Sequence, residues 1–173
     1  MISRRSFMQG LAAAALLYPF SGAFGSVPPE KSLRLYNTHT DERLDIAYFA
    51  DGKYDFEALE KINHLMRCHY SNEVRAIDIR LLDLLSDISD RLETSNRIEI
   101  ISGYRSFEYN EYLRTRGRKV ARDSFHMQGL AADFTISGFS KTELSGIAKS
   151  FYAGGVGKYS RFIHVDVGPV RYW

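Results

Sequence analysis

The sequence predicts an α+β fold, with a small, mostly antiparallel sheet and helices packed on one face. Apolar residues alternate over several short segments, as in half-buried strands, and recur at three- and four-residue steps over residues 77–92, as in a helix. These segments do not follow the regular strand–helix order of a parallel sheet. A chain of 173 residues is long enough for one domain with a well-buried core.

The N-terminus has the pattern of an export signal. Arg4 and Arg5 precede an apolar run that is shorter than the roughly 20 residues a membrane-spanning helix needs. The stretch SRRSFM resembles a twin-arginine signal and is followed by small residues suited to cleavage. We therefore expect residues 1–25 to be a twin-arginine signal peptide and residues 26–173 to form a single domain in the periplasm, without a stable membrane span. An anchor left uncut is the alternative.

Charge and cysteine content exclude several classes of protein. The chain has 23 basic and 21 acidic residues. Removing a signal that contains Arg4 and Arg5 leaves 21 of each, so the sequence predicts no nucleic-acid partner, which would need a basic face. Cys68 is the one cysteine. An intramolecular disulfide and a cysteine-rich zinc site are therefore excluded, and any metal must be held by His, Asp or Glu.

The first half of the domain predicts a hairpin and two helices. Residues 32–49 alternate as two strands around turn-forming residues at Asn37 to Glu42. Asp55 is a candidate N-cap for a helix over residues 56–70. The clearest helix covers residues 76–93, where an apolar stripe is opposed by charged positions.

The second half predicts three strands separated by two helices. The strands cover residues 97–103, 129–137 and 162–168, each with alternating or continuous apolar residues. The helices cover Tyr109 to Arg116 and residues 141–153, and both end near glycine. Neither a repeat nor a linker divides this part of the chain.

Two of these strands carry residues that can bind a metal. Strand periodicity places His164 and Asp166 on one face, and it places Asp133 on a face of small residues. A buried aspartate in such surroundings is costly unless it is paired or metal-bound. If the strands are neighbours, Asp133 and His164 converge, and His126 in the preceding loop can close over them.

Such a His–Asp–His set has the chemistry of a catalytic zinc site. Three nitrogen and oxygen ligands leave a fourth tetrahedral position open, as in catalytic sites and unlike closed structural ones. Zinc lowers the pKa of bound water to about 7 and polarises a carbonyl oxygen. The pattern therefore predicts a zinc site on the sheet that hydrolyses an amide.

The same residues resemble a known family. The pattern S-x-H-x-x-G-x-A-x-D over residues 124–133 is similar to the first signature of the zinc peptidoglycan peptidases, the LAS metallopeptidases that include D-Ala-D-Ala carboxypeptidases and dipeptidases. SGYRS upstream and FIHVD downstream fit in order and spacing. Further segments, among them YNTHTDERL and HVDVGPVRYW, extend the resemblance over nearly the whole mature chain.

The resemblance implies a role for each candidate residue. His126, Asp133 and His164 would be the ligands of Zn²⁺. Arg105 would face the substrate carbonyl or carboxylate, where it would stabilise the oxyanion of the reaction. Ser124 would orient a neighbouring ligand or contact the substrate.

The general base is not determined by the resemblance. Relatives place an acid or a second histidine two, three or six residues before the last ligand, where this chain has Phe162, Arg161 and Lys158. Asp166 is the nearest carboxylate. It is either the general base or the acceptor of a hydrogen bond from a ligating imidazole.

The expected function is that of a murein endopeptidase. The resemblance implies a zinc peptidase that binds peptidoglycan stem peptides and hydrolyses cross-links, with links between two diaminopimelate residues as the expected bond. Two alternatives stay open: a D,D-carboxypeptidase or D,D-endopeptidase acting on stem peptides, and a non-hydrolytic cell-wall binding module that contains zinc.

Overall fold

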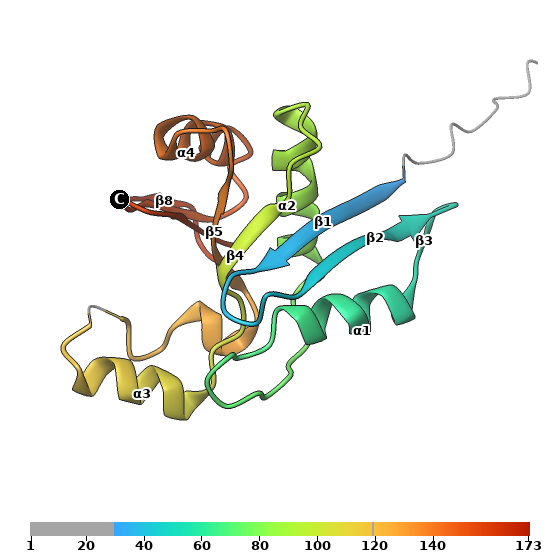
Figure 1. Cartoon of the computed structure of the whole chain (residues 1–173). Coiled ribbons are helices and arrows are strands. Elements are labelled where there is room, and N and C mark those ends of the chain that lie inside the picture. The colour runs from blue at the N-terminus through green and yellow to red at the C-terminus, as the bar shows by residue number, and fades with distance from the viewer. Residues whose placement is uncertain (1–29, 119) are drawn as a thin grey trace, which may run out of the picture.

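The structure is a computed structural model that describes residues 30–118 and 120–173 (Figure 1). The predicted signal peptide, residues 1–25, lies outside the described residues. The described part of the chain contains the α-helices α1 (Phe56–Leu65), α2 (Ile79–Arg91), α3 (Phe107–Thr115) and α4 (Lys141–Ser150), and a short 3₁₀ helix, η1 (Phe125–Gln128). Its strands are β1 (Lys31–Asn37), β2 (Arg43–Ala50), β3 (Lys53–Tyr54), β4 (Ile98–Ser102), β5 (Ala131–Ile136), β6 (Gly155–Lys158), β7 (Ile163–Asp166) and β8 (Arg171–Tyr172).

The strands form one sheet in the order β3-β2-β1-β4-β5-β7-β6-β8. Neighbouring strands are antiparallel except in the pairs β1–β4 and β6–β8, which are parallel. The α+β fold with a mostly antiparallel sheet is therefore confirmed. None of the helices in the described residues is long and apolar enough to cross a membrane.

Polar side chains cap the N-termini of α1 and α4. The predicted N-cap Asp55 accepts a hydrogen bond from the backbone N–H of Ala58 at 3.1 Å, and Ser140 forms a reciprocal capping box with Glu143 at the start of α4. The first helix ends at Leu65, earlier than expected. Met66 is the C-cap, and its carbonyl accepts a hydrogen bond from the N–H of Tyr104 rather than from a further helical residue.

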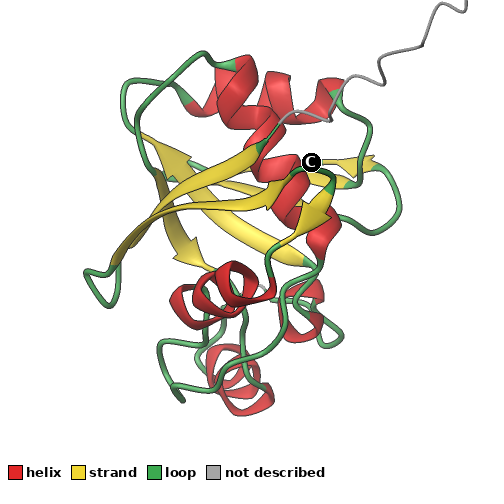
Figure 2. Ribbon diagram, turned by 90° about the vertical axis from the view of Figure 1, so that its right-hand side faces the viewer, coloured by secondary structure: helices red, strands yellow, loops and turns green. Residues whose placement is uncertain are grey.

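One hydrophobic core joins the sheet to α1, α2 and α4. Helices α2 and α4 lie together on one side of the strands, while α3 and η1 lie at the other end of the molecule (Figure 1, Figure 2). The described residues of α3 contribute only Asn110 to the buried set. This helix therefore adds little to the core.

The half of the sheet formed by β5, β7 and β6 has two different faces. The residues that alternate toward the core are Ala132, Phe134, Val156, Ile163 and Val165. The residues between them face away from the core: Ala131 and Asp133 of β5, Gly155 and Gly157 of β6, and His164 and Asp166 of β7. The period of two that packs the core thus also places Asp133, His164 and Asp166 together on the opposite surface.

Candidate metal centre and cleft

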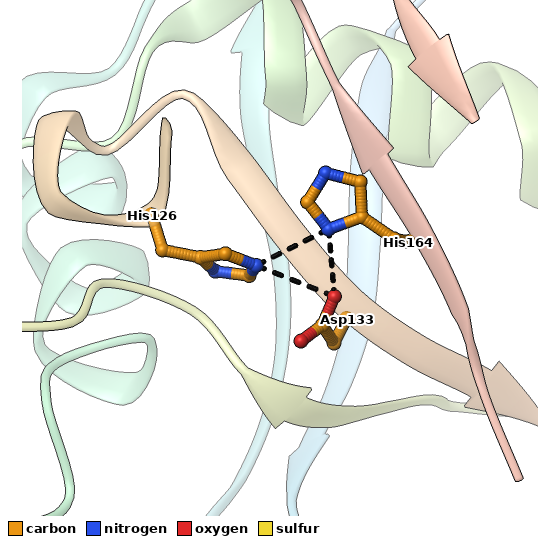
Figure 3. Close-up of side chains that lie close together, drawn as sticks. All are labelled: His126, Asp133 and His164. Carbon is orange, nitrogen blue, oxygen red and sulfur yellow. Dashed lines mark hydrogen bonds and ion pairs between the residues drawn. The ribbon is translucent and has the colours of Figure 1, made fainter. Parts of the chain in front are cut away.

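The three predicted metal ligands come together as expected (Figure 3). Asp133 lies directly opposite His164 in the antiparallel pair β5–β7, and His126 reaches over from η1. Asp133 Oδ1 lies 2.8 Å from His164 Nδ1 and 3.3 Å from His126 Nε2, and the two imidazole nitrogens are 3.2 Å apart. Two nitrogens and one carboxylate oxygen thus converge on one point.

His126 is held by the backbone of the SGYRS segment. Its Nδ1 lies 2.8 Å from the carbonyl oxygen of Gly103. The backbone carbonyl of His126 accepts a hydrogen bond from the N–H of Arg105 at 3.1 Å. Since the carbonyl of Gly103 can only accept, the ring proton sits on Nδ1, and the lone pair of Nε2 points into the cluster. Gly129 ends η1 with a φ of +72°, and a side chain there would collide with the carbonyl of Ala76.

His164 is fixed on both ring nitrogens. While Nδ1 faces Asp133, Nε2 lies 3.1 Å from Asp166 Oδ2. Asp166 is fully buried, and its carboxylate also accepts hydrogen bonds from Arg171, at 2.7 and 3.1 Å, and from the N–H groups of Gly155 and Gly168. All sides of this carboxylate are therefore occupied by donors.

The charges of the cluster suit a metal. Burial raises the pKa of Asp133, but His126 and His164 outweigh that effect and lower it below its ordinary value. Burial lowers the pKa of His126 below that of a free imidazole. For His164, burial also acts to lower the pKa, but its hydrogen bonds to Asp133 and Asp166 raise it overall. The site therefore presents an ionised carboxylate beside a neutral His126.

Arg105 is a buried cation with few partners. Its Nη2 lies 3.7 Å from Asp133 Oδ2 and 3.4 Å from Ser102 Oγ, and its Nη1 lies 3.4 Å from the side-chain oxygen of Asn110. Its Nε has no hydrogen-bond partner among the described residues. Although burial lowers its pKa, an arginine stays protonated, so the guanidinium can still pair with an anion.

A cleft of about 340 Å³ opens over the cluster. The polar residues that line it include Arg105, Asp123, Ser124, His126, Asp133, His164 and Arg171, and the aromatic ones are Phe125, Tyr159, Phe162 and Trp173. Ser124 is buried at the start of η1, and its hydroxyl does not cap that helix. The cleft thus gathers Arg105 and Ser124 with the three ligands, whereas Asp166 lies behind His164 and does not line it.

Part of this lining was not predicted from the sequence. Asp123, Tyr159, Arg171 and Trp173 were not among the predicted site residues. Asp123 sits beside the signature serine, and Trp173 is the one tryptophan of the chain. These two features were the available signals in the sequence. The contacts that bring the residues to the cleft depend on pairing between strands that are distant in the sequence.

The fold and the site together define a candidate metallopeptidase. A buried carboxylate and two imidazoles are open to a cleft that also holds a buried arginine, which is a set able to bind a metal and a peptide together.

The chain belongs to a known peptidase family. The family model described as "Peptidoglycan L,D-endopeptidase MepK" matches residues 26–173. The protein named Peptidoglycan L,D-endopeptidase MepK from Escherichia coli (strain K12) is 40% identical over 168 residues, covering 95% of this chain and 92% of the relative. A probable MepK from Haemophilus influenzae is 38% identical, covering 95% and 90%. No solved structure gives a significant match. The resemblance to zinc peptidoglycan peptidases is therefore confirmed, and the chain is a peptidase.

Proposed function

We propose that this chain is a periplasmic, zinc-dependent murein endopeptidase that hydrolyses peptide cross-links of peptidoglycan, with links between two diaminopimelate residues as its substrate. One observation carries the proposal: the His126–Asp133–His164 cluster opens into a cleft beside the buried Arg105. Its relatives are named peptidoglycan L,D-endopeptidases, which supports the substrate class. Since cross-links lie outside the cytoplasm, an exported protein is required.

The residues of the cluster fit zinc. His126 Nε2, His164 Nδ1 and an oxygen of Asp133 lie within 4.8 Å of one another, and imidazole and carboxylate are the donors that catalytic zinc prefers. The hydrogen bonds of both imidazoles to other groups hold these donor atoms in place before any ion binds. Zinc, when bound, supplies a Lewis acid that acidifies water and polarises a carbonyl.

Arg105 is the residue we propose for binding charge on the substrate. Its guanidinium is buried, only loosely bound by neighbours, and able to donate several hydrogen bonds at once. In this position it would pair with a substrate carboxylate or with the oxyanion that develops at the scissile carbonyl. Ser124, on the same cleft, would contact the peptide near His126.

We propose that Asp166 is a positioning residue rather than the general base. It is fully buried, does not line the cleft and is saturated by donors, which makes it unsuited to take a proton from water or substrate. Its contact with Nε2 instead keeps the proton of His164 away from Nδ1, the nitrogen that faces the metal position.

Defined muropeptide dimers test the proposal. The purified chain is incubated with dimers joined through two diaminopimelate residues or through D-alanine and diaminopimelate, and the products are identified by mass spectrometry. We expect cleavage of the first dimer only. Cleavage of the second would favour a D,D-endopeptidase, release of terminal D-alanine would favour a D,D-carboxypeptidase, and binding without any cleavage would favour the cell-wall binding module.

A further inference from the structure

An aromatic wall stands next to the cluster. The indole of Trp173 lies with its ring centre 5.4 Å from that of His164, tilted by 43°. The rings of Tyr159 and Phe162 stack at 4.7 Å, and all three aromatic residues line the same cleft as the candidate ligands. These rings therefore form part of the cleft wall beside His164.

The wall is fixed before any ligand binds. The backbone N–H of Trp173 donates to the carbonyl of Val156 at 3.2 Å, and its own carbonyl accepts from the N–H of Lys158 at 2.9 Å. The indole Nε1–H donates to the hydroxyl of Tyr159 at 2.9 Å. Two backbone hydrogen bonds thus anchor the tryptophan and one holds its side chain, which reduces the freedom the indole would lose on binding.

Gly157 provides the space for the indole. A Cβ atom at this position would lie 2.5 Å from the ring of Trp173, so only glycine lets the ring approach β6 this closely. Gly157 pairs with His164 across β6 and β7, which puts the indole beside that imidazole. The guanidinium carbon of Arg171 lies 5.1 Å from the indole ring centre, while the same guanidinium binds Asp166.

The wall leaves ring surface open to a ligand. Trp173 is 49% exposed and Tyr159 is 42% exposed, although a hydrogen bond joins their side chains. Since the indole N–H is already bonded, the wall offers mainly apolar ring surface and no free indole donor. Such a surface favours contact with methylene groups. Diaminopimelate has this shape, a short methylene chain between two polar ends.

We infer that Trp173 and Tyr159 form a subsite for the methylene chain of the diaminopimelate residue next to the scissile amide, with Arg105 on the same cleft receiving a carboxylate. This inference rests on the proposed function and names the part of the substrate that the cleft recognises. Trp173 acts as a specificity residue and takes no part in proton transfer.

The single tryptophan gives a direct binding signal. Intrinsic fluorescence of the zinc-loaded chain is titrated with a stem tetrapeptide that contains diaminopimelate and has no cross-link. We expect a saturable change in emission, because the peptide covers the exposed indole. The same tetrapeptide with alanine in place of diaminopimelate should leave the emission unchanged. An equal response to both peptides would overturn the inference.

Three variants test the subsite in kinetics. Trp173→Ala should raise KM for the diaminopimelate dimer on the order of 10-fold with a smaller change in kcat, the size of effect expected when an apolar contact is lost. Gly157→Val should have the same effect, because it displaces the indole without removing it. Tyr172→Ala is the matched control: Tyr172 neighbours the tryptophan, but its hydroxyl bonds to the carbonyl of Lys149, away from the cleft. It should leave KM unchanged.

The outcomes separate this inference from the proposed function. If the enzyme cleaves the dimer and Trp173→Ala keeps the wild-type KM while folded, as judged by circular dichroism, the subsite is wrong and the proposed function stands. If no dimer is cleaved but fluorescence responds only to the diaminopimelate peptide, the subsite stands and the proposed function is wrong. Failure of Gly157→Val to fold leaves the decision with Trp173→Ala and its control.

Discussion

At the scale of single residues, much of the site follows from elementary rules. Strand periodicity predicts that His164 and Asp166 share a face, and the register of β5 and β7 places Asp133 opposite the histidine. The cost of burying an aspartate among small residues predicts that it must have partners, and it has two imidazoles. The orientation of Asp166 toward Nε2 could not be predicted, because it depends on Arg171 and on close glycine backbones.

Arg105→Lys should lower kcat/KM by about 100-fold, with zinc still bound, because lysine keeps the charge but loses the planar fork that can bind an oxyanion or carboxylate at two points. Steady-state cleavage of the muropeptide dimer, with bound zinc measured on the same samples, gives the result. Arg114→Lys is the control, since Arg114 pairs with Glu111 on the exposed side of α3. Near wild-type activity in Arg105→Lys would refute the proposed role.

Asp166→Asn should weaken zinc binding by about 10- to 100-fold, because a neutral amide replaces the charged carboxylate that orients His164. Saturating zinc should restore most of the rate. Zinc affinity is measured by competition with a chromophoric chelator. Asp123→Asn is the comparison, as it removes a carboxylate that lines the cleft. Unchanged zinc affinity with a loss of about 10²–10⁴-fold in rate would instead identify Asp166 as the general base.

At the scale of elements, long periodic segments were predictable and short ones were not. The strands that became β1, β2, β4, β5 and β7 and all four helices were expected, with ends displaced by a few residues. The two-residue strands β3 and β8 are too short for any alternation to be seen, and β6 is rich in glycine. Pairing of β8 with β6 therefore could not be predicted, and neither could the aromatic wall that depends on it.

The glycines of β6 yield a stability prediction. Gly155→Ala should lower the free energy of unfolding by about 1–3 kcal/mol, because its methyl group would overlap the carboxylate of Asp166 and the guanidinium of Arg171. Gly146→Ala in α4 has open space and a helical position, so it should raise the free energy by about 0.5–1 kcal/mol. Urea unfolding of both variants measures the difference. Equal effects would show that the close packing around Asp166 is unimportant.

At the scale of the whole molecule, the sheet separates stability from chemistry. Along β5, β7 and β6, one face is part of the hydrophobic core and the other carries the candidate ligands. The core behind β5 and β7 holds the backbone of Asp133 and His164 in register. The third candidate ligand, His126, comes from η1 and not from the sheet. The separation explains how a buried polar cluster is tolerated without disturbing the core.

Zinc should therefore stabilise the whole domain. A ligand that binds only the folded state raises the free energy of unfolding by about 4 kcal/mol when its free concentration is about 1,000 times Kd. This stabilisation appears as a higher Tm. Thermal unfolding of the metal-free chain with and without added zinc measures the effect. His126→Ala should abolish the increase, whereas Arg114→Lys should preserve it. A similar increase in His126→Ala would place the stabilising ion elsewhere.

The most direct test of the central claim is cleavage of the diaminopimelate-linked dimer by one preparation in three states: as purified with zinc, after removal of the metal with a chelator, and after zinc is returned. Products are read by mass spectrometry, and bound zinc is quantified in each state. We expect activity to disappear with the metal and to return with one zinc per chain. Undiminished cleavage by the metal-free chain would contradict the account.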